Sequence, residues 1–249
     1  MSDQPPPYVH PQPQPTPWAS PAAPLAPPVP PKPIRPINGL AVLAVAGLVV
    51  WFLTNLAAVV VSVLRYFLIE QFIVDQNAVP IADLEASDAA YQLTGVLELA
   101  GYVVAGVLFI VWLFRARANA EAILPFQHRL AKPWLVFGWI VPIIAWWFPK
   151  NIVDDIWKTS DPAMTQRNPK AGGGGPKIVL VWWLVFLLGT WVGNAVMRSI
   201  VGAETLEDIQ VAAGAEVVLA PVSWAGAILA VVVIARLSKL QESQRLGRA

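Results

Sequence analysis

Four long apolar runs constrain the fold of this chain more than any other feature of its sequence. Their residue ranges are 39–64, 91–114, 178–197 and 214–235. Two of the runs contain a single glutamate each, and the other two carry no charge. A helix needs about 20 apolar residues to cross a bilayer core of about 30 Å. All four runs reach that length, so the sequence predicts an all-α, polytopic membrane helix bundle with four transmembrane helices.

The composition agrees with this class and excludes several others. The chain is 56% hydrophobic and 13% charged, whereas soluble domains carry about 25% charged residues. Too few charges remain to cover the surface of a soluble protein of 249 residues. The absence of cysteine excludes disulfides, cysteine nucleophiles and thiolate metal sites. A net charge of +1 gives no reason to expect a nucleic-acid partner.

Proline is concentrated at the start of the chain, where 15 of the 24 prolines lie between Pro5 and Pro36. Proline fixes φ and removes backbone donors, so this stretch suits neither a helix nor the interior of a sheet. The sequence therefore predicts a disordered, Pro-rich tail before the first apolar run. The predicted parts of the chain are this tail at 1–37, a transmembrane domain at 38–240 and a C-terminal tail at 241–249.

The basic residues are sorted along the chain in a way that predicts its orientation. Of the 17 lysines and arginines, 15 lie in the N-terminal tail, between the second and third runs, or after the fourth run. The positive-inside rule places these three regions in the cytoplasm. We therefore expect a multi-pass protein of the cell membrane with an even number of crossings and with both termini cytoplasmic.

A fifth apolar stretch is too short and too interrupted to be a fifth span. It contains 15 residues, from Trp134 to Phe148, and Pro142 divides it. The residues that follow, up to Ser160, have the pattern of an amphipathic helix. We therefore expect 134–160 to form a Trp/Pro-rich interfacial or re-entrant hairpin. The glycine run within 168–177 predicts a flexible linker, because it lacks the Lys-Ser/Thr of a phosphate-binding loop.

A series of Trp, Pro, Arg and Asn positions follows a distinctive order in the middle of the chain. Its parts are W-L-F-R-A-R-A-N from Trp112, G-W-I-V-P from Gly138, W-F-P from Trp147 and I-W-K-T-S from Ile156. This order resembles the bacterial, actinobacterial-type membrane-protein family catalogued as domain of unknown function 4328. The resemblance extends from residue 39 to residue 240, implies an integral membrane protein, and assigns no catalytic residue or ligand. Ala145-Trp146 stands where the family usually has Asn-Leu, so a role for that amide does not transfer to this chain.

Polar side chains within the predicted spans gather in the outer half of the bundle, together with two arginines at its outer rim. We call them the outer polar cluster: Asn55, Glu98, Thr190, Asn194, Glu216, Ser223, Arg65 and Arg198. Such residues are costly in lipid and often functional. They are therefore our first candidate site, a small cavity open to the outside in which Glu98 faces Arg65 or Arg198. Interhelical packing with a salt bridge at the rim is the alternative interpretation.

Tryptophans of the 134–160 segment and nearby arginines form the second candidate site. The residues are Arg115, Arg117, Trp134, Trp139, Trp146, Trp147 and Trp157. Indole rings favour the membrane interface and basic side chains attract anionic headgroups, so this set predicts a lipid-binding groove on the cytoplasmic side. Anchoring alone is the alternative, with Asp154 or Asp155 paired to Arg115 or Arg117.

Catalytic and metal-binding patterns are absent from the sequence. His10 and His128 are the only histidines, and neither lies in a metal-ligand or a Ser/His/Asp pattern. We therefore expect no enzyme activity, no cofactor and no metal site.

Two functions remain for a chain of this kind. The first is a structural or interaction protein, a membrane scaffold whose Pro-rich tail recruits a cytoplasmic protein partner while the lipid bilayer holds the rest. Pro5-Pro6-Pro7-Tyr8 fits an aromatic groove, although a low-complexity spacer is the simpler interpretation. The alternative is a small-solute or lipid transporter that uses the outer polar cluster.

Small residues spaced four apart occur on two of the predicted spans. The steps are Gly189/Gly193 and Gly101/Ala105. Small residues let helices approach closely, so we expect close packing within one chain, and homo-oligomerisation stays open.

Overall fold

The computed structural model describes residues 32–124, 128–167 and 175–247, and within these ranges no strand is present. The elements are α1 (Asn38–Val74), α2 (Ile81–Ile123), α3 (Trp134–Ile140), η1 (Ile144–Trp146), α4 (Phe148–Ser160), α5 (Pro162–Arg167), α6 (Lys177–Val201) and α7 (Leu206–Leu246). Most of the predicted Pro-rich tail and of the predicted glycine linker lies outside the described residues.

Four of the helices, α1, α2, α6 and α7, are long and apolar enough to cross a membrane. This confirms the predicted all-α bundle with four transmembrane helices, and the chain is a multi-pass integral membrane protein. The helices extend beyond the apolar runs because helix-forming polar residues flank them. For example, α7 begins ahead of its run at Leu206, after the N-cap residue Thr205, whose hydroxyl accepts a hydrogen bond from the Asp208 N–H in a capping box.

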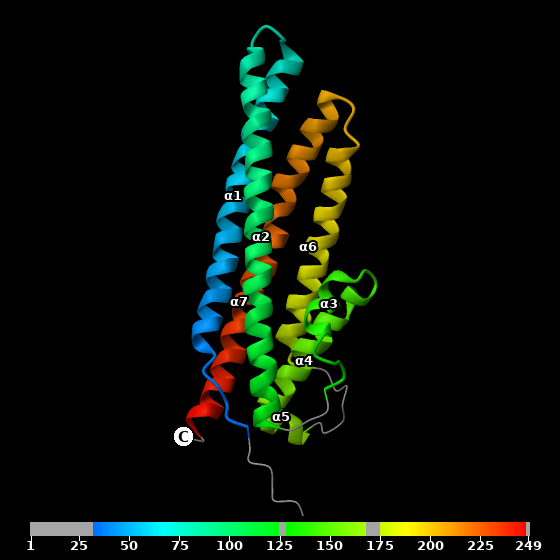
Figure 1. Ribbon diagram of the computed structural model, residues 1–249. Coiled ribbons are helices and arrows are strands. Elements are labelled where there is room, and N and C mark those ends of the chain that lie inside the picture. The colour runs from blue at the N-terminus through cyan, green and yellow to red at the C-terminus, as the bar shows by residue number, and fades with distance from the viewer. Residues whose placement is uncertain (1–31, 125–127, 168–174, 248–249) are drawn as a thin grey trace, which may run out of the picture. The chain divides into compact units, whose positions relative to one another are not determined.

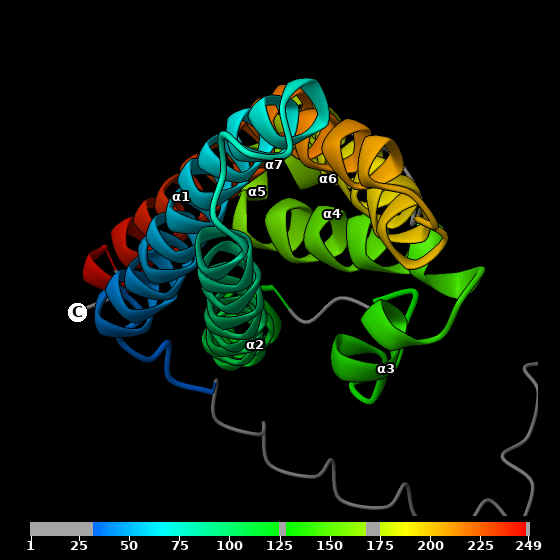
Figure 2. The same cartoon turned by 90° about the horizontal axis from the view of Figure 1, so that it is seen from above.

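Residues from Lys32 onward form one compact unit, in which the four long helices stand in the order α2, α1, α7 and α6 (Figures 1 and 2). We call the end that carries Lys32 and Leu246 the terminal end. The opposite end, with the α1–α2 and α6–α7 connections, is the hairpin end (Figure 1). At the terminal end, α4 crosses between α2 and α6 and packs against both of them and against α7 (Figure 2).

Close contact between α1 and α2 depends on small residues, as the sequence predicts. A Cβ added at Gly101 would lie 2.6 Å from Thr54 Oγ1 and 3.2 Å from Trp51 Cα. On α6, a Cβ added at Gly189 would lie 3.6 Å from Ser223 Cα on α7, but one at Gly193 would meet no atom within 4 Å. The small-residue steps therefore serve packing within the chain at Gly101 and Gly189, and Gly193 faces open space.

The 134–160 segment forms α3, a turn, η1 and α4, and no helix within it is long enough to cross the membrane. Ile143, at the turn, has a positive φ of 56°, a conformation that β-branched residues rarely adopt. It follows Pro142, the residue whose ring ends α3 as expected.

The burial of α4 differs from the expectation of a helix lying at the membrane surface. Its apolar side, with Ile152, Val153 and Ile156, is in the core, as the amphipathic pattern indicates. The charged side is buried as well, since Asp154 and Asp155 are only 2% and 3% exposed. A buried charge needs a partner, and these carboxylates find theirs among basic side chains of the same end of the bundle.

Candidate functional site

Three helices contribute to a polar layer in the interior of the bundle, on its hairpin-end half. The Asn55 Nδ2 group of α1 donates a hydrogen bond of 2.7 Å to Glu98 Oε1 of α2. Trp224 Nε1 of α7 donates one of 2.6 Å to Asn55 Oδ1. Asn55 is therefore the central residue of this inner layer, and its side chain is buried.

A second, outer layer repeats the arrangement nearer the hairpin end. Ser62 Oγ donates to Glu216 Oε2 at 2.9 Å, and the Tyr91 hydroxyl donates to the same oxygen at 3.4 Å. On α1 and on α2 the two layers are seven residues apart, and on α7 they are eight apart. Because seven residues make about two helical turns, α1 and α2 each present both of their layer residues from one face.

The rim of the hairpin end carries an ion pair beside these layers. Arg65 Nη1 lies 2.8 Å from Asp88 Oδ1, and the Arg65 guanidinium lies 4.8 Å from the centre of the Tyr91 ring. A cavity of about 170 Å³ adjoins this pair. Its lining consists of Arg65, Tyr91, Ile200, Ala203, Ile209, Ala212 and Ala213.

The structure brings together only part of the predicted outer polar cluster. Asn55, Glu98, Glu216 and Arg65 lie in or beside the two layers. The expected pairing of Glu98 with Arg65 or Arg198 is replaced, because Glu98 accepts from Asn55 and Arg65 binds Asp88. Asp88 could not be chosen from the sequence, because it lies before the apolar run of its helix.

The other members of the cluster lie elsewhere. Asn194 is exposed on α6 and its amide donates to Thr190 O of the same helix, and Arg198 is exposed near the end of that helix. Ser223 lies across from Gly189 at the α6–α7 contact. Sequence reasoning missed Ser62, Tyr91 and Trp224, for which the seven-residue spacing of Asn55 and Ser62 was the available signal.

At the terminal end, the chain that leads into α1 is fixed to the end of α2. Asn119 Oδ1 accepts a hydrogen bond of 2.9 Å from the Arg35 N–H, and Asn119 Nδ2 donates one of 2.8 Å to Arg35 O. Arg115 Nη1 donates to Pro36 O at 2.9 Å, and the next side chain, Ile37, is fully buried. We call these three hydrogen bonds the root clamp.

A buried glutamine joins three helices beneath the root clamp. Gln241 Nε2 of α7 donates to Ala116 O of α2 and to Ser160 Oγ of α4, both at 2.8 Å. Nearby, Trp112 Nε1 donates to Ser238 Oγ at 2.9 Å. These buried bonds fix α2, α4 and α7 to one another, because breaking any of them would leave a polar group unpaired in the core.

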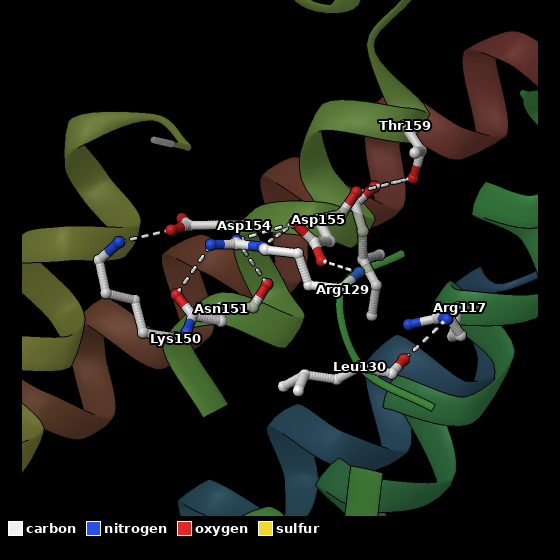
Figure 3. Close-up of polar contacts among 9 residues, drawn as sticks. Arg117, Arg129, Leu130, Lys150, Asn151, Asp154, Asp155 and Thr159 are labelled. Atoms are coloured by element: carbon white, nitrogen blue, oxygen red, sulfur yellow. Dashed lines mark hydrogen bonds and ion pairs between the residues drawn. The ribbon is translucent and has the colours of Figure 1, made fainter. Parts of the chain in front are cut away.

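The carboxylates of α4 bind basic residues other than those expected (Figure 3). Arg129 Nε lies 2.8 Å from Asp155 Oδ1, and the Arg129 N–H donates to Asp155 Oδ2 at 3.0 Å. Lys150, one turn earlier on α4, pairs with Asp154. The predicted pairing of these aspartates with Arg115 or Arg117 was therefore wrong, because the loop before α3 brings Arg129 over α4.

Arg117 on α2, one of the two arginines expected to bind Asp154 or Asp155, has other partners. Arg117 Nε donates to Glu121 Oε1 at 2.9 Å. Arg117 Nη2 donates to Leu130 O at 3.2 Å, as Figure 3 shows. Burial, helped by the positive charge of Arg117, lowers the pKa of nearby His128 to about 4. His128 is therefore neutral near pH 7, and Arg117 holds the loop before α3 in place.

The second candidate site is divided between the core and the surface. Trp139 makes edge contacts with Phe109, Trp183 and Phe186, and Trp157 is buried beside α4's other core residues. Trp134 packs on Phe148, and Trp146 and Trp147 remain exposed. Arg115 and Arg117 both bind protein groups, so the described contacts give these two arginines and the buried tryptophans a packing role. In the described ranges, no three His, Asp or Glu side chains come together as metal ligands.

Several of the residues that carry the sequence resemblance lie together at this terminal end. Arg115 and Asn119 form the root clamp, and Trp112 and Ser160 belong to the bonds beneath it. No curated protein and no solved structure matches the chain. Residues 75–239, well over half of the chain, match the family described as Domain of unknown function (DUF4328), and the chain belongs to that family.

Proposed function

We propose that this protein is a membrane scaffold that presents its Pro-rich N-terminal segment to protein partners at the membrane surface. The four long helices serve as the anchor, and the terminal end is the platform from which the segment leaves. The basic residues of this end predict that the platform faces the cytoplasm of a bacterial-type cell membrane.

The root clamp is the observation that carries the proposal. It holds the backbone of residues 35 and 36, at the end of the predicted Pro-rich tail, by three hydrogen bonds. Asn119, which makes two of them, is 1% exposed. A mere spacer needs no fixed origin, whereas a segment that recruits partners gains from leaving the membrane at a defined point.

The bonds beneath the clamp support the same interpretation. Gln241, Ser160 and Ser238 are buried and bonded to partners on other helices, so the platform is rigid in its interior. Rigidity suits a protein that holds a segment in place, because no energy is lost in ordering the platform when a partner binds.

Transport of a small solute or lipid is the second candidate function. The cavity beside Arg65 and Tyr91 favours it, because the cavity adjoins polar layers in the interior of the bundle. Transport would need this cavity, and the scaffold function would need the Pro-rich segment, so the two functions depend on opposite ends of the bundle.

The test compares proteins that co-purify from cross-linked native membranes with three forms of the chain. These are the full chain, a form lacking residues 1–31, and a form in which the order of residues 1–31 is scrambled. We expect specific partners with the full chain and a loss of at least tenfold with both altered forms. A partner set that is the same for all three forms would refute the scaffold proposal. Transport is tested separately by comparing the uptake of small solutes and lipids by the Arg65→Gln and Tyr91→Phe variants with uptake by the unaltered chain.

A further inference from the structure

The outer layer holds a carboxylate without a basic partner among the described residues. Glu216 lies about three turns into α7, within the apolar run, and is half-buried. Its described hydrogen-bond donors are the hydroxyls of Ser62 and Tyr91, which are neutral. An ionised carboxylate is costly in such surroundings, so Glu216 is most stable either with a bound proton or with a cation beside it.

The only described cation beside this layer is engaged elsewhere at present. Arg65 lies three residues after Ser62 on α1, which places it on the same side of the helix. Its guanidinium lies over the ring of Tyr91, whose hydroxyl contacts Glu216. Its present partner, Asp88, has a side chain that is 58% exposed, and water competes strongly for such a partner. Arg65 is therefore placed to exchange one carboxylate for the other.

The cavity gives Glu216 a route to solvent. Tyr91 and Arg65 line the cavity of about 170 Å³, and the Tyr91 hydroxyl reaches Glu216 Oε2. A cavity of this volume, with polar groups in its wall, has room for several water molecules. Tyr91 is thus the link between the cavity and the carboxylate.

We propose that Glu216 is a proton-binding site that is served from this cavity. When the proton leaves, the Glu216 carboxyl O–H donates it to the Tyr91 oxygen, and the Tyr91 O–H gives its own proton to water in the cavity. The negative charge left on Glu216 is then neutralised by Arg65, which turns away from Asp88 and leaves Asp88 to solvent. This site goes beyond the scaffold function and does not depend on it.

The groups that act on this proton come from two helices besides α7. They are Arg65 on α1, and Asp88, Tyr91 and Glu98 on α2. From α6 and the start of α7, the cavity wall is apolar, with Ile200 and Ile209. Arg65 favours the ionised form of Glu216, and Asp88 opposes it by its own charge and by holding Arg65.

The experiment uses the full chain in lipid nanodiscs and follows the carboxylic C=O stretch by infrared difference spectroscopy across a pH titration. Glu216→Gln is expected to remove one protonated-carboxyl band. Glu207→Gln, an exposed position in the first turn of the same helix, is the matched control and should leave that band in place. A spectrum that is unchanged by Glu216→Gln would overturn the proposal.

Two charge variants test the exchange of Arg65 even if Glu216→Gln does not fold. Arg65→Gln should raise the midpoint of the band's titration, because the ionised form loses its cation. Asp88→Asn should lower the midpoint, because Arg65 is released. Each shift is expected to be about one pH unit, or tenfold in proton affinity. Shifts in the same direction, or no shift in either variant, would overturn the proposal.

Discussion

At the scale of single residues, Asn119 shows why the terminal end needs an amide at one position. The side chain accepts a hydrogen bond from the Arg35 N–H and donates one to Arg35 O, so it pairs with both backbone groups of that residue as a neighbouring strand would. A carboxylate of the same shape only accepts, and an alanine does neither. The choice of residue at this position therefore decides whether the chain before α1 is held.

We expect Asn119→Asp and Asn119→Ala to release the root of the N-terminal segment. The unpaired backbone groups and, for aspartate, the repulsion from Arg35 O should destabilise the docked conformation by about 1–3 kcal/mol. A spin label on Lys32→Cys measures this, since the chain has no other cysteine. Its spectrum should become more mobile in both variants. Asn77→Asp, an exposed substitution in the α1–α2 connection, should leave the label unchanged.

At the scale of elements, small residues along the contact between α1 and α2 allow the two helix backbones to approach closely. Gly101 faces Trp51 and Thr54, and Gly47 faces Ala105, so the contact continues over several turns. In lipid, close packing of this kind replaces much of the hydrophobic force that joins helices in water. A methyl group added within this contact would therefore push the two helices apart along the contact.

Gly101→Ala should lower the free energy of unfolding by about 1–3 kcal/mol, because the new Cβ overlaps backbone and side-chain atoms of α1. Gly193→Ala is the matched control in α6, because its Cβ meets no atom within 4 Å. Unfolding of the purified chain in mixed micelles with increasing SDS, followed by tryptophan fluorescence, compares the two. Equal midpoints for both variants would contradict the described contact between α1 and α2.

The helix α4 shows the limit of an amphipathic pattern. The pattern identifies which side of the helix is apolar, and that side is indeed in the core. It does not reveal that the charged side is also covered: Lys150 and Asp154 are a local pair one turn apart on α4, but Arg129 reaches Asp155 only in the folded chain. Both buried carboxylates follow the same physical rule, which is that a buried charge needs a partner of opposite charge.

At the scale of the whole molecule, the two ends of the bundle differ in kind. The terminal end carries the root clamp and the buried bonds of Gln241, and the hairpin end carries the Arg65–Asp88 pair and the cavity. An orientation in the membrane gives each end its own compartment. The scaffold proposal places the terminal end in the cytoplasm, and the proton site would then exchange with the outside.

Introduced cysteines test this orientation in intact cells. A cysteine at Ala86, exposed near the start of α2, should react with a membrane-impermeant thiol reagent added from outside. A cysteine at position 173, before α6, should react only after the membrane is permeabilised, because the basic flanks keep that connection inside. Labelling of both positions from the same side would contradict the four crossings. The reverse pattern would keep the crossings and invert the orientation.

The sequence by itself determined the class of protein, the four spans and the short fifth segment. These follow from the length of apolar runs and from proline, which act locally and need no knowledge of neighbouring helices. Only the tertiary structure decided which polar groups meet. Asn55 and Glu98 come together while Asn194 turns to its own helix, and Arg129 rather than Arg117 binds Asp155. The physical reason is that rotation and packing of the helices, which the apolar runs leave free, determine each side chain's neighbours.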